Sequence, residues 1–154
     1  MIRGLRSPNV VHESPVSHRL RYEGSVTANY QRLRPDLHRF LGSLVNDLHG
    51  TPLEIGGVAD HVHVLARIKP VISISEFLSK FKSQSSGWAN RKTHGRFKWQ
   101  VKYGAFTVSQ SQVDRVREYI RNQEVHHSRI SFEEEFKALL QSHGIEFEEK
   151  YLWI

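Results

Sequence analysis

The residues best suited to chemistry are two histidines, His61 and His63, separated by one valine. They open a segment, residues 61–68, whose β-branched and apolar content favours a strand. Side chains alternate between the faces of a strand, so both imidazoles should point to one side while Val62 points to the core. Two imidazoles about 7 Å apart at their Cα atoms can converge on one divalent cation. An edge strand with two solvated or hydrogen-bonded imidazoles is the simpler alternative.

Tyr119 and Gln123 form a second pair of chemical interest. Residues four positions apart are neighbours on a helix surface, so these two side chains should share one face. A phenol can act as a nucleophile, and an amide oxygen is a hard donor of the kind that Mg²⁺ or Mn²⁺ accepts. In the alternative, Tyr119 packs on the sheet with its hydroxyl satisfied, and Gln123 lies in solvent.

The composition is that of a basic globular protein. The net charge is +6 and the sequence pI is about 9.8, a balance that favours polyanionic partners such as nucleic acid. Because the chain has no cysteine, disulfides, zinc–thiolate sites and cysteine nucleophiles are excluded. No apolar run approaches the ~20 residues of a membrane span, and no signal-peptide core is recognised. We therefore expect a cytoplasmic protein with no membrane partner.

Hydrophobic periodicity and capping residues predict four helices and three strands from Pro35 onward. The helices are expected at about residues 35–48, 74–92, 111–123 and 131–144. The strands are expected at 53–55, 61–68 and 97–108, the last with a bend near Gly104. Residues 56–60 should form the turn that makes the first two of these strands an antiparallel pair.

The order of these elements indicates an α+β fold. One strand placed upstream would complete the pattern β-α-β-β-α-β, the split β-α-β or ferredoxin-like arrangement. Its antiparallel sheet carries helices on one face, and an added helix bearing Tyr119 follows here. Residues 1–32 show no sustained period, and short apolar pieces such as 9–11 are too brief to assign the first strand. We expect a divergent N-terminal segment over 1–32 and the main domain over 33–154.

The helix expected at 74–92 carries a basic face. Its residues Lys80, Lys82 and Arg91 could contact DNA phosphates, while aromatic residues such as Trp88 stack on bases. A solvated charged face without a ligand is the alternative.

Several motifs in the same order resemble one family. His61-Val62-His63 resembles the His-hydrophobic-His motif of HUH nucleases. Tyr119-Ile120-Arg121-Asn122-Gln123, followed by His126-His127, resembles the single-tyrosine helix of the IS200/IS605-type transposases, which include the REP-associated tyrosine transposases. The resemblance extends from about Pro35 to the C-terminus, and its further motifs are Leu53–Gly57, Trp99-Gln100, Tyr103–Phe106, Ser131-Phe132 and Glu134–Phe136.

The resemblance implies a metal-dependent transposase that cuts and rejoins single-stranded DNA, in which His61, His63 and Gln123 hold Mg²⁺ or Mn²⁺. Tyr119 would attack a phosphodiester, keep a 5′-phosphotyrosine link and release a free 3′-OH. The implied partners are a hairpin-bearing DNA strand and a second copy of the chain. In such a homodimer, the tyrosine helix of one subunit serves the histidines of the other.

The sequence departs from the family at its start, where the family's first strand and the Thr/Lys/Arg-type turn after it are not recognised. A divergent strand, a replaced or frame-shifted N-terminus and a decayed element copy would each explain this. A decayed copy would be a non-catalytic ferredoxin-like module that binds nucleic acid, with Tyr119 in a structural role. A metal phosphoesterase that uses water is a third interpretation, and it would form no covalent link to DNA.

Overall fold

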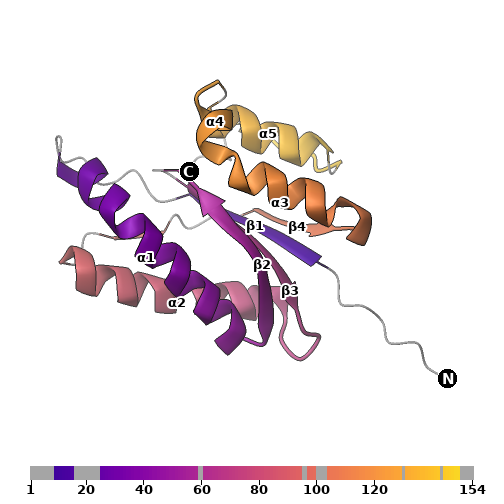
Figure 1. Cartoon of the computed structure of the whole chain (residues 1–154). Coiled ribbons are helices and arrows are strands. Elements are labelled where there is room, and N and C mark those ends of the chain that lie inside the picture. Colours follow the sequence, from indigo (N-terminus) through magenta and orange to yellow (C-terminus); the bar gives the residue numbers. More distant parts are fainter. Residues whose placement is uncertain are drawn as a thin grey trace.

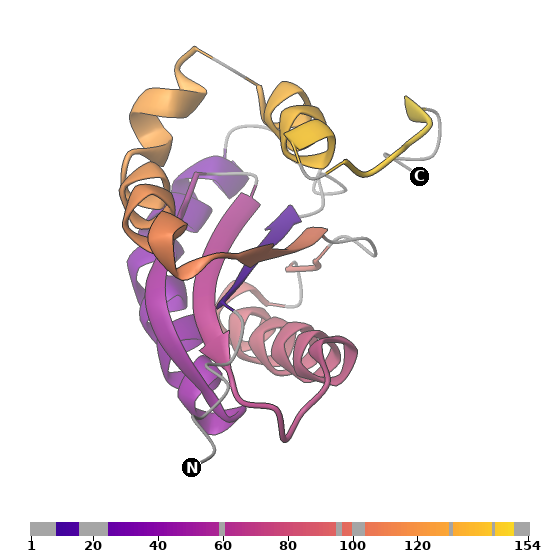
Figure 2. The ribbon, with the colours of Figure 1, turned by 90° about the vertical axis from the view of Figure 1, so that its right-hand side faces the viewer.

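The computed structural model describes residues 9–15, 25–58, 61–94, 97–99, 104–129, 131–142 and 144–149. Within them, four antiparallel strands form one sheet in the order β2-β3-β1-β4 (Figure 1). The strands are β1 (Asn9–Pro15), β2 (Gly50–Gly57), β3 (His61–Ile68) and β4 (Gly104–Val108). Figure 2, turned by 90° from Figure 1, shows the strands next to one another, with β1 between β3 and β4.

The strand β3 is buried on both of its faces. Leu65 packs in one cluster with Ile120, beneath the tyrosine-bearing helix. Because side chains alternate, His61 and His63 lie on the same face as Leu65. The residues of the opposite face belong to the larger core, and they are Val62, Val64, Ala66 and Ile68.

Two long helices cover the face that carries this larger core. The helix α1 (Ser25–Asp47) packs on β2 and on α2 (Ile74–Thr93), which lies beside it (Figure 1). At the start of α2, the Ser73 hydroxyl accepts a hydrogen bond from the backbone N–H of Glu76 at 3.2 Å, so Ser73 is the N-cap of this helix. The buried apolar residues of α2 are Phe77, Leu78, Phe81 and Ala89.

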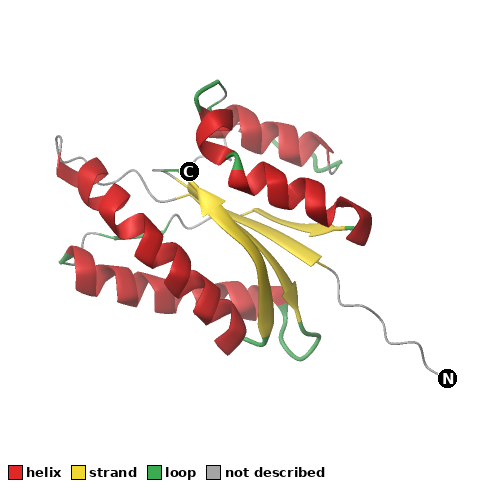
Figure 3. Ribbon diagram, in the orientation of Figure 1, coloured by secondary structure: helices red, strands yellow, loops and turns green. Residues whose placement is uncertain are grey.

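The remaining helices form a second layer on the other side of the sheet. A 3₁₀ turn, η1 (Gln110–Gln112), leads into α3 (Val113–Arg121), α4 (Gln123–His127) and α5 (Phe132–Ser142). The helix α3 contacts β2 and, less extensively, β3. Figure 3 shows helices on both sides of the strands. None of the described helices has the length and apolar character needed to cross a membrane.

The predicted α+β ferredoxin-like fold with an added tyrosine-bearing helix is confirmed. The strand that the sequence left unassigned is β1. It lies in the middle of the sheet, where Val11 pairs with Leu65 on one side and Phe106 on the other. Hydrogen bonds to two neighbouring strands therefore hold this short segment, which has too few apolar residues to show a period of its own.

Several boundaries differ from the prediction. The helix α1 begins at Ser25, well before Pro35, which lies inside it. Proline removes one helical hydrogen bond, but Leu33 and Leu37, on either side of it, are both buried and keep the helix against the core. The division expected after residue 32 falls within α1. The strand expected at 97–108 is observed as β4 and as a single bridge residue, Trp99. Residues 100–103 of that strand and residues 59–60 of the expected turn lie outside the described residues.

The helix α3 approaches β2 closely because Gly56 has no side chain. A Cβ atom at Gly56 would lie 2.5 Å from the backbone oxygen of Ile120 and 2.7 Å from its Cγ2. Beside this contact, Arg121 Nε donates a hydrogen bond to the Glu54 carboxylate on β2 at 2.8 Å. Arg117 Nε lies 4.0 Å from the same carboxylate. One glycine and one carboxylate on β2 therefore position α3.

His38 predicts a pH dependence of stability. Burial, with a smaller contribution from Arg34, lowers the pKa of His38 from 6.5 to about 4, and its Nε2 has no hydrogen-bond partner within the described residues. Between pH 6.5 and 4 the unfolded chain binds a proton that the folded chain does not, so stability present above pH 6.5 falls as the pH drops. When the pH is lowered from about 7.5 to 5, the free energy of unfolding measured with urea should fall by about 1 to 2 kcal/mol less in His38→Leu than in wild type. Equal losses in both proteins would contradict this.

Gly56→Ala should loosen the contact between α3 and β2. The added methyl overlaps Ile120, so the unfolding free energy should fall by about 1 to 3 kcal/mol, and the amides of α3 should exchange faster. Gly87→Ala is the matched control, because its new Cβ would lie 3.8 Å from its nearest neighbour, Arg91 Nη1. Alanine at this helical position should stabilise the protein by about 0.5 to 1 kcal/mol. Unchanged hydrogen exchange in α3 of Gly56→Ala would show that the contact does not hold the helix.

Candidate active site

The strand β3 places His61 and His63 side by side on the α3 face of the sheet. Both side chains are 0% exposed, and their ring centroids lie 4.9 Å apart with the ring planes at 87°. Pairing of β3 with β1 on one side and β2 on the other fixes their backbone. Because β3 is an inner strand and both imidazoles are buried, the alternative of solvated histidines on an edge strand is wrong, whereas the hydrogen-bonded imidazole that it also allowed is observed at His61.

Gln123 joins the two histidines, although not through the continuous helix that the sequence predicts. The helix α3 ends at Arg121, and Asn122 leaves helical geometry with φ −93° and ψ 16° before α4 begins. This break turns the Gln123 side chain inward, where it is 1% exposed and its Oε1 lies 3.1 Å from His61 Nε2. The alternative of a solvated glutamine is therefore wrong as well.

Glu135 is a member of the cluster that the sequence did not identify. Its Oε2 lies 3.6 Å from His61 Nε2 and 3.6 Å from His63 Nε2, and the residue is 4% exposed. Its Oε1 accepts a hydrogen bond from Gln123 Nε2 at 3.3 Å. The motif Glu134–Phe136 is part of the resemblance, but a run of three glutamates does not reveal which one turns inward.

The start of α5 explains why the second of these glutamates stays outside. Ser131 and Glu134 form a capping box, in which the Ser131 N–H and hydroxyl donate to Glu134 Oε2 at 2.9 and 2.8 Å. These hydrogen bonds hold the pKa of the Glu134 carboxyl below its usual value. With Glu134 used as a cap and Glu133 exposed, Glu135 is the member of the run that reaches the histidines.

Tyr119 lies against the same cluster. Its ring centroid is 5.6 Å from that of His63 and 5.2 Å from that of His126, with both contacts edge-on. His126 Nε2 in turn lies 3.3 Å from Glu135 Oε1. The family resemblance assigns His126 no chemical role, and its position beside Tyr119 and Glu135 depends on how α4 and α5 fold back. His127, noted beside it, has a side chain outside the described residues.

A cavity of about 960 Å³ opens next to Tyr119, between β4, α3 and α5. Most of its wall is apolar, and Tyr119, His126 and Glu135 form the end nearest the histidines. Two basic residues, Arg115 and Arg129, also line it. The cavity therefore gives access to Tyr119 and to the Glu135 edge of the cluster, whereas His61, His63 and Gln123 do not line it.

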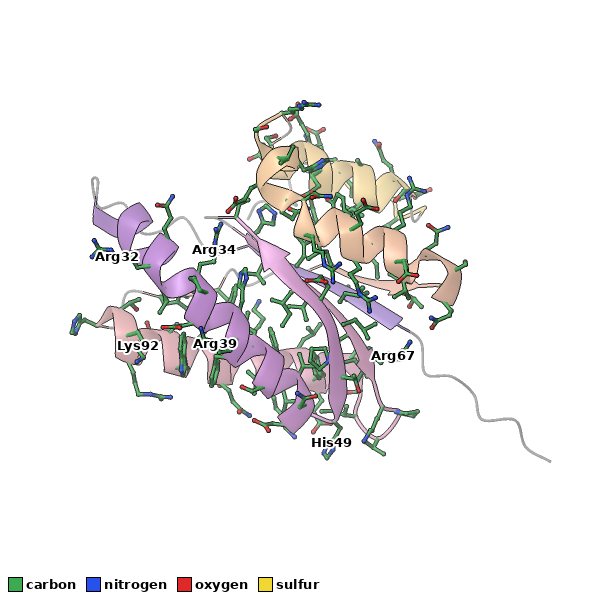
Figure 4. The ribbon with its side chains drawn as sticks, in the orientation of Figure 1. Arg32, Arg34, Arg39, His49, Arg67 and Lys92 are labelled. Carbon is green, nitrogen blue, oxygen red and sulfur yellow. The ribbon has the colours of Figure 1, made fainter. Side chains whose placement is uncertain are left out.

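The predicted phosphate-binding residues of α2 lie on the other side of the sheet from this cluster. Lys80 Nζ is 2.8 Å from Glu76 Oε1, and burial lowers the pKa of the Lys82 ammonium. Arg91 is exposed in the last turn of α2. Further basic residues extend from the α1–α2 side, away from α3 (Figure 4), and they include Arg32, Arg39 and Lys92. The structure does not bring Lys80, Lys82 and Arg91 together with Tyr119.

The donor atoms of the cluster fit a divalent cation. One ligand atom each from His61, His63 and Glu135 lie within 4.8 Å of one another. Around a cation with bonds of about 2.1 Å, neighbouring ligand atoms are roughly 3 to 3.5 Å apart. The spacings of 3.1 Å from Gln123 to His61 and 3.6 Å from Glu135 to either histidine are close to this range. Imidazole, amide and carboxylate groups together suit a borderline or hard metal.

Two solved structures share this fold at low sequence identity. One is a protein from Deinococcus radiodurans R1 assigned as a transposase, with 18% identity and a TM-score of 0.54 over 80% of this chain and 98% of that one. The other is a REP-associated tyrosine transposase bound to a REP hairpin, with 14% identity and a TM-score of 0.56 over 84% of this chain and 74% of that one. No curated protein sequence matches the chain.

A family model described as IS200-like transposase matches residues 19–123, which is more than half of the chain. The match includes the two histidines, the tyrosine and the glutamine, and it ends before α5. This chain therefore belongs to the family of IS200-like transposases.

Proposed function

We propose that the chain cuts and rejoins single-stranded DNA through a covalent link between Tyr119 and a 5′-phosphate. The observation that carries this proposal is the position of the Tyr119 ring, 5.6 Å from the His63 ring of the same chain. A nucleophile beside atoms that can hold a cation is an arrangement suited to phosphoryl transfer. Membership of the IS200-like family supports the same chemistry.

In the proposed cutting step, the phenolic oxygen of Tyr119 bonds to the scissile phosphorus, and the P–O3′ bond breaks. The phenol loses its proton and the departing 3′-oxygen gains one, so the strand ends in a free 3′-OH. Because the phosphotyrosine ester replaces the phosphodiester, a later 3′-OH can reverse the step and reseal the strand without ATP. One residue would therefore serve both cutting and rejoining.

His61, His63 and Gln123 would hold Mg²⁺ or Mn²⁺ beside the scissile phosphate. Such a cation, when bound, polarises the phosphoryl oxygen and stabilises developing negative charge. This stabilisation matters because roughly one phenol in a thousand is ionised at neutral pH, so forming the phenolate costs about 4 kcal/mol of free energy. The chain itself contributes orientation, since Tyr119 is held between the rings of His63 and His126.

The proposed substrate is a hairpin-bearing single strand. The REP-associated neighbour is bound to a REP hairpin, and the net charge of +6 favours a polyanion here. The cavity beside Tyr119 offers a route for the strand, with Arg115 and Arg129 in its wall to meet phosphates. Lys80, Lys82 and Arg91 could contact DNA only where it passes to the far side of the sheet, and their role stays a prediction. We expect the enzyme to act on DNA in the cytoplasm.

Tyr119→Phe should abolish the covalent adduct. Wild type incubated with a labelled hairpin oligonucleotide and Mn²⁺ should give a protein–DNA band that survives a denaturing gel, and Tyr119→Phe should give none. Tyr30→Phe, in α1 on the far side of the sheet, is the matched control and should form the adduct as wild type does. An adduct from Tyr119→Phe would exclude this nucleophile. Cutting without any adduct would favour a phosphoesterase, and binding without cutting would favour a non-catalytic module.

Mixing two inactive variants tests whether each chain completes its own site. The resemblance implies a homodimer with shared sites, whereas α3 in the described chain contacts β2 and β3 of that same chain. We therefore expect a mixture of Tyr119→Phe and His61→Ala to stay inactive, because no single chain would hold both the phenol and the histidine pair. Adduct formation by the mixture would show instead that tyrosine helices are exchanged between subunits. Circular dichroism of each variant controls for folding.

A further inference from the structure

We infer that Glu135 is an anionic ligand of the metal centre, in addition to His61, His63 and Gln123. This inference rests on the proposed function, which makes the cluster a catalytic metal centre. The residue that it adds lies beyond the region that the family model matches. Its consequence is that the chain should bind a divalent cation before DNA arrives.

The first observation is the position of one carboxylate oxygen. Glu135 Oε2 is 3.6 Å from the Nε2 atoms of both His61 and His63, so it completes a triangle with the two imidazoles. Gln123 Oε1 approaches the same centre, 3.1 Å from His61 Nε2. The carboxylate oxygen thus lies near both imidazole nitrogens and the amide oxygen near one of them, a grouping of N and O donors that one cation could share.

The second observation is that the other carboxylate oxygen is held separately. Glu135 Oε1 accepts a hydrogen bond from Gln123 Nε2 at 3.3 Å and lies 3.3 Å from His126 Nε2. Such contacts orient a ligating carboxylate and leave its second oxygen directed at the metal. Gln123 would thus serve twice, through its amide oxygen on the cation and through its amide nitrogen on Glu135.

The charge of the ligand set decides when the metal binds. Two imidazoles and one amide are neutral, so a site made of these alone would bind Mg²⁺ or Mn²⁺ weakly until a DNA phosphate adds negative charge. A carboxylate that is 4% exposed changes this balance, because a divalent cation beside it offsets the cost of burying the charge. Because two of the ligands are imidazoles, the site should also favour Mn²⁺ over Mg²⁺, which takes oxygen ligands.

Titration of the DNA-free protein with Mn²⁺, followed by calorimetry and by electron paramagnetic resonance, tests the inference. Wild type should bind one Mn²⁺ per chain, and Glu135→Gln should bind it more than ~100-fold more weakly, a loss beyond that of a residue that only orients a ligand. Glu133→Gln is the matched control, because it removes the same charge from an exposed position in the first turn of α5. Its Mn²⁺ affinity should equal that of wild type.

A second variant covers the case in which Glu135→Gln does not fold. Glu135→Asp keeps the charge but shortens its reach, so its Mn²⁺ affinity should lie between that of wild type and that of His61→Ala. Thermal unfolding with and without Mn²⁺ gives an independent readout, because the metal should raise the melting temperature of wild type and of Glu133→Gln fully, and that of Glu135→Asp by a smaller amount.

Three results separate this inference from the proposed function. Wild-type affinity in Glu135→Gln, or in Glu135→Asp if only that variant folds, would overturn the inference. So would a wild type that binds no Mn²⁺ without DNA yet forms the adduct when DNA and Mn²⁺ are both present; the proposed function would then stand. Glu135-dependent Mn²⁺ binding in a protein that never forms an adduct would support the ligand assignment and overturn the tyrosine chemistry.

Discussion

The contact between α3 and β2 is the constraint on which the site depends. The sheet fixes the positions of His61 and His63. Tyr119 lies on a separate helix, α3, which can approach the sheet closely because the residue facing it on β2 is a glycine. At Gly56, a Cβ atom would lie 2.5 Å from the backbone oxygen of Ile120, the residue after the tyrosine. The ion pair of Glu54 with Arg121 then limits how the helix can rotate. The position of Tyr119 thus depends on the packing of its helix against β2 and on the ring contacts with His63 and His126.

Side chains alternate along β3, so the core residues lie on one face of the strand and the candidate site residues lie on the other. Its even-numbered side chains fill the core beneath α1 and α2, and its odd-numbered ones face α3. Because both faces are buried, the two imidazoles are enclosed without interrupting the main core. The second helical layer therefore completes the candidate site on this face, because α3, α4 and α5 supply Tyr119, Gln123 and Glu135 in turn.

Much of this could be predicted from the sequence, because it depends on local periods. A period of two placed His61 and His63 on one face. Helical spacing located α3, and helical spacing together with a capping serine located α2 and α5. Gln123 was identified through a spacing of four, although the helix breaks at Asn122 and the side chain reaches the site by another path.

The remaining features depend on tertiary contacts that no local pattern contains. The strand β1 exists because β3 and β4 pair with it on either side. Glu135 cannot be told from Glu133 and Glu134 until α5 is folded back against the histidines. The basic residues of α2 were predicted from charge alone, which does not say on which side of the sheet a helix will lie.

The central place of β1 has a consequence for how this fold can be divided. The family match begins at residue 19, but the sheet begins at Asn9. A fragment cut to the matched region would lose the strand that joins β3 to β4, so β3 and β4 would each expose an edge that β1 pairs with in the intact sheet. The stretch of sequence that is hardest to recognise is thus the one that keeps the two halves of the sheet in a single piece.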